Sequence, residues 1–261
     1  MSVLLSNAPV YYALAQAKFN PVAAMAKFSS EIQDRMRMSG FTLFETDETQ
    51  NINFGDLSQS ANAAPVVTTS TIWFFTKPDR SCGYVLGPDF LIFQSTKYER
   101  RESFFESLCA GINIVHEIVK LSSLVRVGIR YLNAVLPKEG EEVNTYLNPQ
   151  VHGIDLGRPW LGGVWESAYK TNSGMLVAKI YKVSHAMLGF PADLLPRSVV
   201  VMDKFQTPTP LAHAVIDMDH FSDSPLTPET DLIYKKLVSL HDELTDCFKA
   251  IATQHAFSTW S

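Results

Sequence analysis

Hydrophobic and polar positions follow two different periods along the first half of the chain, and each period predicts a type of element. Residues 10–19 are predicted to form a strand that stops at Pro21, because proline lacks the amide donor of a ladder. From Pro21 to Gly40, apolar residues recur every three or four positions, which is typical of an amphipathic helix. A longer helix is predicted at 97–121. Further strands are predicted at 41–44, 68–76, 84–86 and 90–95, and the Asn- and Ser-rich stretch 50–64 is predicted to be a long loop.

The second half of the chain repeats this order, with an irregular insertion. Residues 124–136 are predicted to form a strand, and residues 138–163 are punctuated by glycine and proline without a clear period. Thr227 and Pro228 are typical of an N-cap and a first helical position, and apolar residues then recur at helical spacing to about residue 252. Further strands are predicted at 164–170, 174–183, 198–205 and 211–221.

This repeated order predicts an α+β fold made of two similar halves, residues 1–121 and 122–261, related by internal duplication. The opening strands also end alike, with AKFNPV at 17–22 and RYLNAV at 130–135. Consecutive antiparallel strands bury one face, and one long helix per half would cover it, over either two sheets or one continuous sheet. The joint between the halves is short, so a single compact unit is expected.

Charge and composition narrow the range of partners. The chain has 22 Lys+Arg against 27 Asp+Glu, a net charge of -5, which argues against binding to nucleic acid or to an anionic membrane surface. Charged residues are 19% of the chain, below the roughly 25% of an ordinary soluble domain, so we expect a protein partner or a second copy to cover part of the surface. Without a leader pattern or a membrane-length apolar run, the protein is expected to be cytoplasmic.

Several segments, taken in order along the chain, resemble a known family. The most specific is the strand Arg126-Val127-Gly128-Ile129-Arg130-Tyr131-Leu132-Asn133, supported by Leu5 to Val10, the Trp73-Phe74 strand, Leu91 to Tyr98, the Ile216 to Phe221 strand, and the closing helix with Leu240-His241 and Phe248. The chain is similar to a sporadically distributed, uncharacterised bacterial family whose members share an RxGxRYxN strand and a late DxDxF strand. This resemblance implies a prokaryotic cytoplasmic protein, with a patchy distribution like that of cargo on mobile or antiviral defence loci. It brings no catalytic residues with it.

The sharpest candidate for chemistry is Asp217-Met218-Asp219-His220. On a strand, Asp217 and Asp219 face the same side roughly 7 Å apart, and two such carboxylates suit a divalent cation. The pattern is also found on the metal strand of nucleotidyltransferases, although the Gly-Ser turn of those enzymes is missing. A structural ion pair with arginine explains the same carboxylates, and this is the interpretation we favour.

Two arginines of another predicted strand, Arg126 and Arg130, are the candidates for this ion pair. Their α-carbons are expected to lie about 13 Å apart, on the face opposite Val127 and Ile129. They either form structural pairs with the aspartates or line a polar groove for an anionic ligand or an acidic partner surface. We expect Arg130 or Arg126 within ion-pairing reach of Asp217 or Asp219.

No complete catalytic motif accompanies these residues. The chain has no HExxH, GxSxG, P-loop or GxGxxG, and its three cysteines are too far apart for a metal knuckle. We therefore expect a non-enzymatic interaction or sensor protein without a cofactor, as a subunit of a bacterial defence or toxin-type system. The alternative is a metal-dependent nucleotidyl- or phosphotransferase that uses Asp217 and Asp219.

Overall fold

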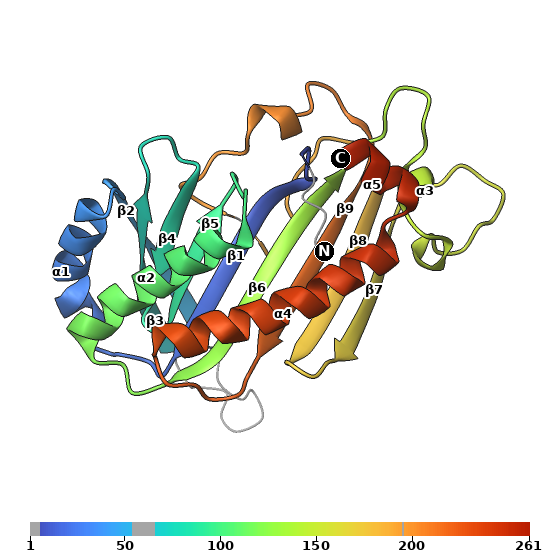
Figure 1. Ribbon diagram of the computed structural model, residues 1–261. Helices are drawn as coiled ribbons and strands as arrows, with labels where there is room; N and C mark the ends of the chain where they lie inside the picture. The colour runs from blue at the N-terminus through green and yellow to red at the C-terminus, as the bar shows by residue number, and fades with distance from the viewer. Residues whose placement is uncertain (1–5, 54–65, 195) are drawn as a thin grey trace, which may run out of the picture.

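The protein is described by a computed structural model that covers residues 6–53, 66–194 and 196–261. Within them, a nine-stranded antiparallel sheet runs in the order β2-β3-β4-β5-β1-β6-β9-β8-β7 (Figure 1). The expected α+β class is confirmed, and the two halves share one continuous sheet. The strands are β1 (Val10–Phe19), β2 (Leu43–Asn53), β3 (Val66–Thr76), β4 (Cys82–Leu86), β5 (Phe90–Ser95), β6 (Leu124–Val135), β7 (Gly162–Lys170), β8 (Met175–Ala186) and β9 (Leu211–Ser222).

The opening strands of the two halves lie side by side at the centre of the sheet. β1 pairs with β6, so the first-half strands extend to one side of this pair and the second-half strands to the other. In each half the opening strand also pairs with the strand that precedes the closing helix: β1 with β5, and β6 with β9. The opening strands of the two halves thus occupy equivalent places in the sheet.

Three long helices cover one face of the sheet (Figure 1). They are α1 (Met25–Met38), α2 (Arg101–Val119) and α4 (Thr230–Ile251), and two short helices, α3 (Val143–Tyr146) and α5 (Gln254–Trp260), pack beside the end of α4. Because strand side chains alternate, Val127, Ile129 and Tyr131 of β6 enter this core, whereas Leu132 and Ala134 face the other side.

The other face of the sheet is crossed by residues 187–194 and 196–207, which we call the strap. Its apolar side chains, including Phe190 and Phe205, pack on Tyr11, Tyr12 and Leu132. The predicted strand at 198–205 is wrong: these residues are irregular and end in a short 3-10 turn, Asp203–Phe205. Val199 and Val201 alternate because an extended segment packs on the sheet, without joining its ladder.

Two element boundaries also differ from the prediction. The loop predicted from residue 50 begins later, because residues 50–53 continue β2 and pair with β3; the rest of that stretch up to residue 64 lies outside the described residues. At the last helix, Glu229 is the N-cap, and Thr227, predicted for this role, donates its hydroxyl to the Glu229 carboxylate at 3.1 Å.

Candidate functional site

Arg130 and Asp217 form a buried, two-pronged ion pair on the strap side of the sheet. Arg130 Nε donates to Asp217 Oδ1 and Nη2 donates to Oδ2, both at 2.7 Å. The Asp217 side chain is 2% exposed and that of Arg130 is 11% exposed. Strand pairing places the two residues on neighbouring strands, β6 and β9, two positions apart in register. The ion pair expected from the sequence is therefore present.

Asp193 of the strap is the third member of this cluster and also binds Arg130. Arg130 Nη1 and Nη2 donate to its two carboxylate oxygens at 2.8 and 3.1 Å. Burial acts to lower the pKa of Arg130. The hydrogen bonds that Arg130 donates to Asp217 and Asp193 outweigh burial and raise the pKa above its ordinary value. One guanidinium thus joins two strands and the strap. Sequence reasoning missed Asp193 because it lies in an irregular segment where no period assigns it a face.

On either side of Asp193, hydrogen bonds attach the strap to residues of the first half. Tyr11 donates its hydroxyl to the Gly189 carbonyl at 2.7 Å, and Gln94 Nε2 donates to the Arg197 carbonyl at 2.9 Å. Thr96 donates its hydroxyl to the Val200 carbonyl at 2.7 Å. These contacts make the strap a second connection between the two halves of the sheet.

Asp219 lies beside this cluster but has a different environment. It is directly opposite Arg130 in the β6–β9 register, yet the guanidinium turns to Asp217 and Asp193. No hydrogen bond or ion pair reaches the Asp219 carboxylate from the residues that the structure describes. Burial raises its pKa to about 6, although the charge of Arg130 acts in the opposite direction. Asp219 is consequently the least stabilised carboxylate of the group.

Arg126, the other candidate arginine, takes no part in this cluster. It pairs with Asp223, to whose Oδ2 its Nη2 donates at 3.1 Å, and its guanidinium carbon lies 4.1 Å from the ring centre of Phe221. Both charged side chains are well exposed, so the pair contributes little to stability. The polar groove hypothesized along Arg126 and Arg130 is occupied at Arg130 by Asp217 and Asp193.

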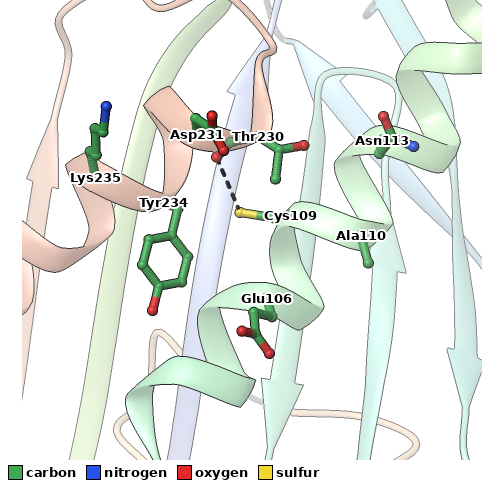
Figure 2. Close-up of a pocket in the computed structure, with 8 residues that line it drawn as sticks. All are labelled: Glu106, Cys109, Ala110, Asn113, Thr230, Asp231, Tyr234 and Lys235. Carbon is green, nitrogen blue, oxygen red and sulfur yellow. Dashed lines mark hydrogen bonds between the residues drawn. The ribbon is translucent and has the colours of Figure 1, made fainter.

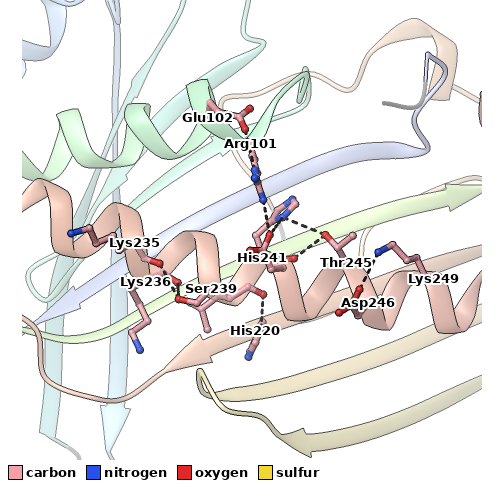
Figure 3. Close-up of polar contacts among 12 residues, drawn as sticks. Arg101, Glu102, His220, Lys235, Lys236, Ser239, His241, Thr245, Asp246 and Lys249 are labelled. Carbon is pink, nitrogen blue, oxygen red and sulfur yellow. Dashed lines mark hydrogen bonds and ion pairs between the residues drawn. The ribbon is translucent and has the colours of Figure 1, made fainter. Parts of the chain in front are cut away.

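His220 lies on the opposite face of the sheet from Asp217 and Asp219. Its Nδ1 donates to the Leu240 carbonyl of α4 at 2.7 Å (Figure 3). Its Nε2 lies 2.9 Å from the Thr171 hydroxyl. Burial lowers its pKa, which favours the neutral ring. His220 therefore anchors the last long helix on the sheet and is separated from the two aspartates by the backbone of β9.

The metal hypothesis loses its main support in this geometry. Both Asp217 oxygens accept hydrogen bonds from Arg130, so this carboxylate is satisfied without a cation. Among the described residues, no group of three or more His, Cys, Asp or Glu side chains is placed to hold a metal ion. The arrangement is that of a structural ion-pair cluster.

A cavity of about 470 Å³ opens between α2 and α4 (Figure 2). Cys109 is the lining residue whose side chain could act as a nucleophile. Its thiol donates to the Thr230 carbonyl at 3.8 Å. Burial raises the Cys109 pKa to about 11, which leaves the thiol protonated and unreactive at neutral pH. The rest of the lining mixes the carboxylates of Glu106 and Asp231 with Lys235. None of the residues singled out from the sequence for catalysis or binding lies in this cavity.

A smaller cavity, of about 110 Å³, lies under residues 8–10 at the other end of α4. Tyr131 and Asn133 of β6 line it together with Tyr98 and His241. Tyr131 donates its hydroxyl to that of Tyr98 at 3.4 Å, and Asn133 donates to the Ile216 carbonyl at 3.2 Å. Its volume is well below the roughly 300 Å³ at which ligand pockets begin, so it does not admit a nucleotide.

His241 also takes part in the contact between the two closing helices (Figure 3). Arg101 of α2 donates to the neighbouring Asp242 at 2.6 Å, and Thr245 donates its hydroxyl to the His241 carbonyl at 2.8 Å. Burial, followed by the nearby charge of Arg101, lowers the His241 pKa to about 4. The ring is thus neutral at physiological pH and serves as a packing residue.

Among the described residues, the three most exposed large apolar side chains lie outside all of these clusters, in residues 154–161, which we call the apolar loop. Ile154, Leu156, Trp160 and Leu161 are 90%, 76%, 40% and 84% exposed. The loop is held at its second end by Ser184, whose backbone amide and hydroxyl donate to the Leu161 carbonyl at 3.0 and 2.9 Å. Sequence reasoning missed this surface because the segment has no period from which burial can be inferred.

Lys182 of β8 supports both ends of this loop. Its ammonium donates to the His152 carbonyl and to Asn144 Oδ1, and it lies 5.6 Å from the ring centre of Trp160. Burial lowers the Lys182 pKa. The apolar loop is consequently a fixed surface feature that presents aliphatic side chains to the solvent.

Comparisons of the chain with protein-family models, with curated proteins and with solved structures found no match. Within the described residues, no helix combines the length and the apolar content that crossing a bilayer requires. The interpretation of function consequently depends on the geometry of this chain alone.

Proposed function

We propose that this protein is a non-enzymatic binding subunit that docks a partner protein on its apolar loop. The exposure of Ile154, Leu156 and Leu161 on an anchored loop is the observation that carries the proposal. Contiguous apolar side chains on a surface are costly unless a partner covers them, and such patches mark interaction sites. The resemblance to a sporadically distributed bacterial family favours a cytoplasmic defence or toxin-type system as the setting.

The polar residues support a binding role over catalysis. Arg130, Asp217 and Asp193 saturate one another, and His220 is used to anchor a helix. Side chains engaged in this way stabilise a scaffold, and Asp219 is the one carboxylate of the group that no described residue pairs with. The strap and the ion-pair cluster would then keep the sheet rigid while the apolar loop binds.

Affinity purification of the tagged full chain from its own host tests this role. We expect a stoichiometric partner with the wild type, and its loss in the variant with Ile154→Ser, Leu156→Ser and Leu161→Ser. Met38→Ser is the matched control, because Met38 is an isolated exposed apolar residue on α1. It should retain the partner, and cross-links from the partner should map to residues 154–161.

Two outcomes would overturn the proposal. The first is retention of the partner by the triple variant while its melting temperature equals that of the wild type. The second is magnesium-dependent turnover of nucleotides by the purified chain that disappears in Asp219→Asn with the fold intact. That result would support the transferase alternative.

A further inference from the structure

The outer strand of the second half, β7, forms an edge of the sheet that the described residues build, and it pairs on one side only, with β8. All nine of its residues pair with β8 in an unbroken register, so no bulge bends it away from a neighbour. Its residues are exposed, apart from Trp165 and Ser167, which are partly buried. A long, regular edge strand presents a row of free backbone donors and acceptors that suits pairing with another strand.

The opposite edge of the sheet differs in its charge. β2 carries Glu45, Asp47 and Glu48 within four positions, so a second β2 beside it would bring carboxylates together. Two of these acids form ion pairs: Glu45 with Arg80, and Asp47 with Arg197 of the strap. Charges of one sign are a common way to protect an edge from self-pairing. β7 has no such run.

The charges of β7 are instead complementary under a two-fold axis. Glu166 and Lys170 lie on the same face of the strand, four positions apart. An antiparallel pairing of two β7 strands with Ala168 at the axis places Glu166 of each copy directly opposite Lys170 of the other. Lys170 makes no ion pair within the described part of the chain, and Glu166 is half exposed although it contacts Lys179 at 3.2 Å.

The apolar side chains at the ends of β7 fit the same arrangement. Val164 near the start of the strand is 59% exposed, and Tyr169 and Met175 near its end are 47% and 44% exposed. In an antiparallel pair centred on Ala168 the start of one strand meets the end of the other, so Val164 of one copy lies opposite the turn after Lys170 of its partner, and Tyr169 lies opposite Ser167 on the other face. The contact is isologous, because each copy supplies the same residues.

We propose that two copies of this chain associate through their β7 edges, with Glu166 opposite Lys170, into one sheet that continues across the dimer. The two helix layers then lie on the same side, and each copy keeps its apolar loop at the end of the shared strand pair. This self-association goes beyond the partner-binding role and uses different side chains, so a dimer can be present or absent whatever the apolar loop binds.

Charge reversal tests the interface with the purified full chain. The molar mass from light scattering should correspond to two copies for the wild type and fall toward one copy for Lys170→Glu, which sets two acids against each other. We expect the dimer dissociation constant to rise on the order of tenfold or more. The double variant E166K/K170E restores opposite charges across the axis and should restore the dimer.

Lys27→Glu on α1 is the control, since Lys27 is equally exposed but far from β7 in the sequence and on a different element. A second measurement follows Ala168→Cys under mild oxidation, which should give a covalent dimer because residue 168 meets its own copy at the axis. A wild type that stays at the mass of one copy at every soluble concentration overturns the proposal. A dimer that survives Lys170→Glu unchanged and gives no Ala168→Cys cross-link also overturns it.

Discussion

Arg130 reaches diagonally across two neighbouring strands to Asp217, and its Nε and Nη2 each donate to one carboxylate oxygen of Asp217 at 2.7 Å. Asp217 is 2% exposed, and Arg130 is the main group that compensates its charge. Such a pair need not add much net stability, but the loss of either member leaves a buried charge without compensation. This asymmetry gives the first prediction.

Asp217→Ala should destabilise the protein strongly. Removal of one member of a buried pair costs about 3–5 kcal/mol, which corresponds to a melting temperature lowered by about 10 °C in a chain of this size. The control is Asp223→Ala, because Asp223 is exposed and its pair with Arg126 is worth at most about 1 kcal/mol. Thermal unfolding monitored by circular dichroism measures both. Equal shifts in the two variants would contradict a buried, structural pair.

Asp193→Ala should loosen the strap more than it lowers global stability. Asp193 is 58% exposed, so the free energy of unfolding should fall by at most about 1 kcal/mol. Hydrogen exchange of the strap amides near residue 193 should nevertheless become faster, because the tie to Arg130 is lost. Asp203→Ala in the same strap is the control, since Asp203 contacts Gln206 within the strap. Unchanged exchange in Asp193→Ala would show that the strap is held without this ion pair.

Asp219→Asn should stabilise the protein at neutral pH. Burial raises the Asp219 pKa to about 6 from an ordinary 3.8, so the folded state keeps its proton at pH values where the unfolded chain has released it. Stability therefore falls as pH rises from about 4 to 6, and the loss persists above that window. The asparagine variant lacks this loss and should gain about 1–3 kcal/mol at pH 7 and little at pH 4. Urea unfolding at both pH values measures the gain. A variant that is less stable than the wild type at pH 7 would contradict the unpartnered carboxylate.

His241→Gln should remove a pH dependence of the opposite sign. Burial lowers the His241 pKa to about 4 from an ordinary 6.5, so on acidification the unfolded chain takes up a proton that the folded chain refuses. Stability consequently falls as pH drops from about 6.5 to 4, by up to about 3 kcal/mol. Relative to the wild type, the variant should lose this slope in urea titrations across the window. His185→Gln, at an exposed position, is the control and should keep it.

The two halves of the fold could be predicted because their elements have strong periods. Val127, Ile129 and Tyr131 alternate with Arg126, Gly128 and Arg130, and this alternation assigned the faces of β6 correctly. The repeated order of strands and closing helix likewise predicted the α+β class. The prediction of a strand at residues 198–205 is wrong, because Val199 and Val201 alternate through contact with the sheet surface and not through pairing with another strand.

The chain's own sequence determined which residues alternate, where prolines and glycines end elements, and that Asp217 and Asp219 share one face of a strand. Tertiary structure alone decided that Arg130 binds Asp217 and Asp193 rather than Asp219, that His220 belongs to the helix side, and that residues 154–161 are exposed. The physical reason is range. Periodicity follows from local backbone geometry, whereas the partner of a charge and the exposure of an apolar loop depend on segments that are distant in the sequence, such as Arg130 and Asp193 at a separation of 63.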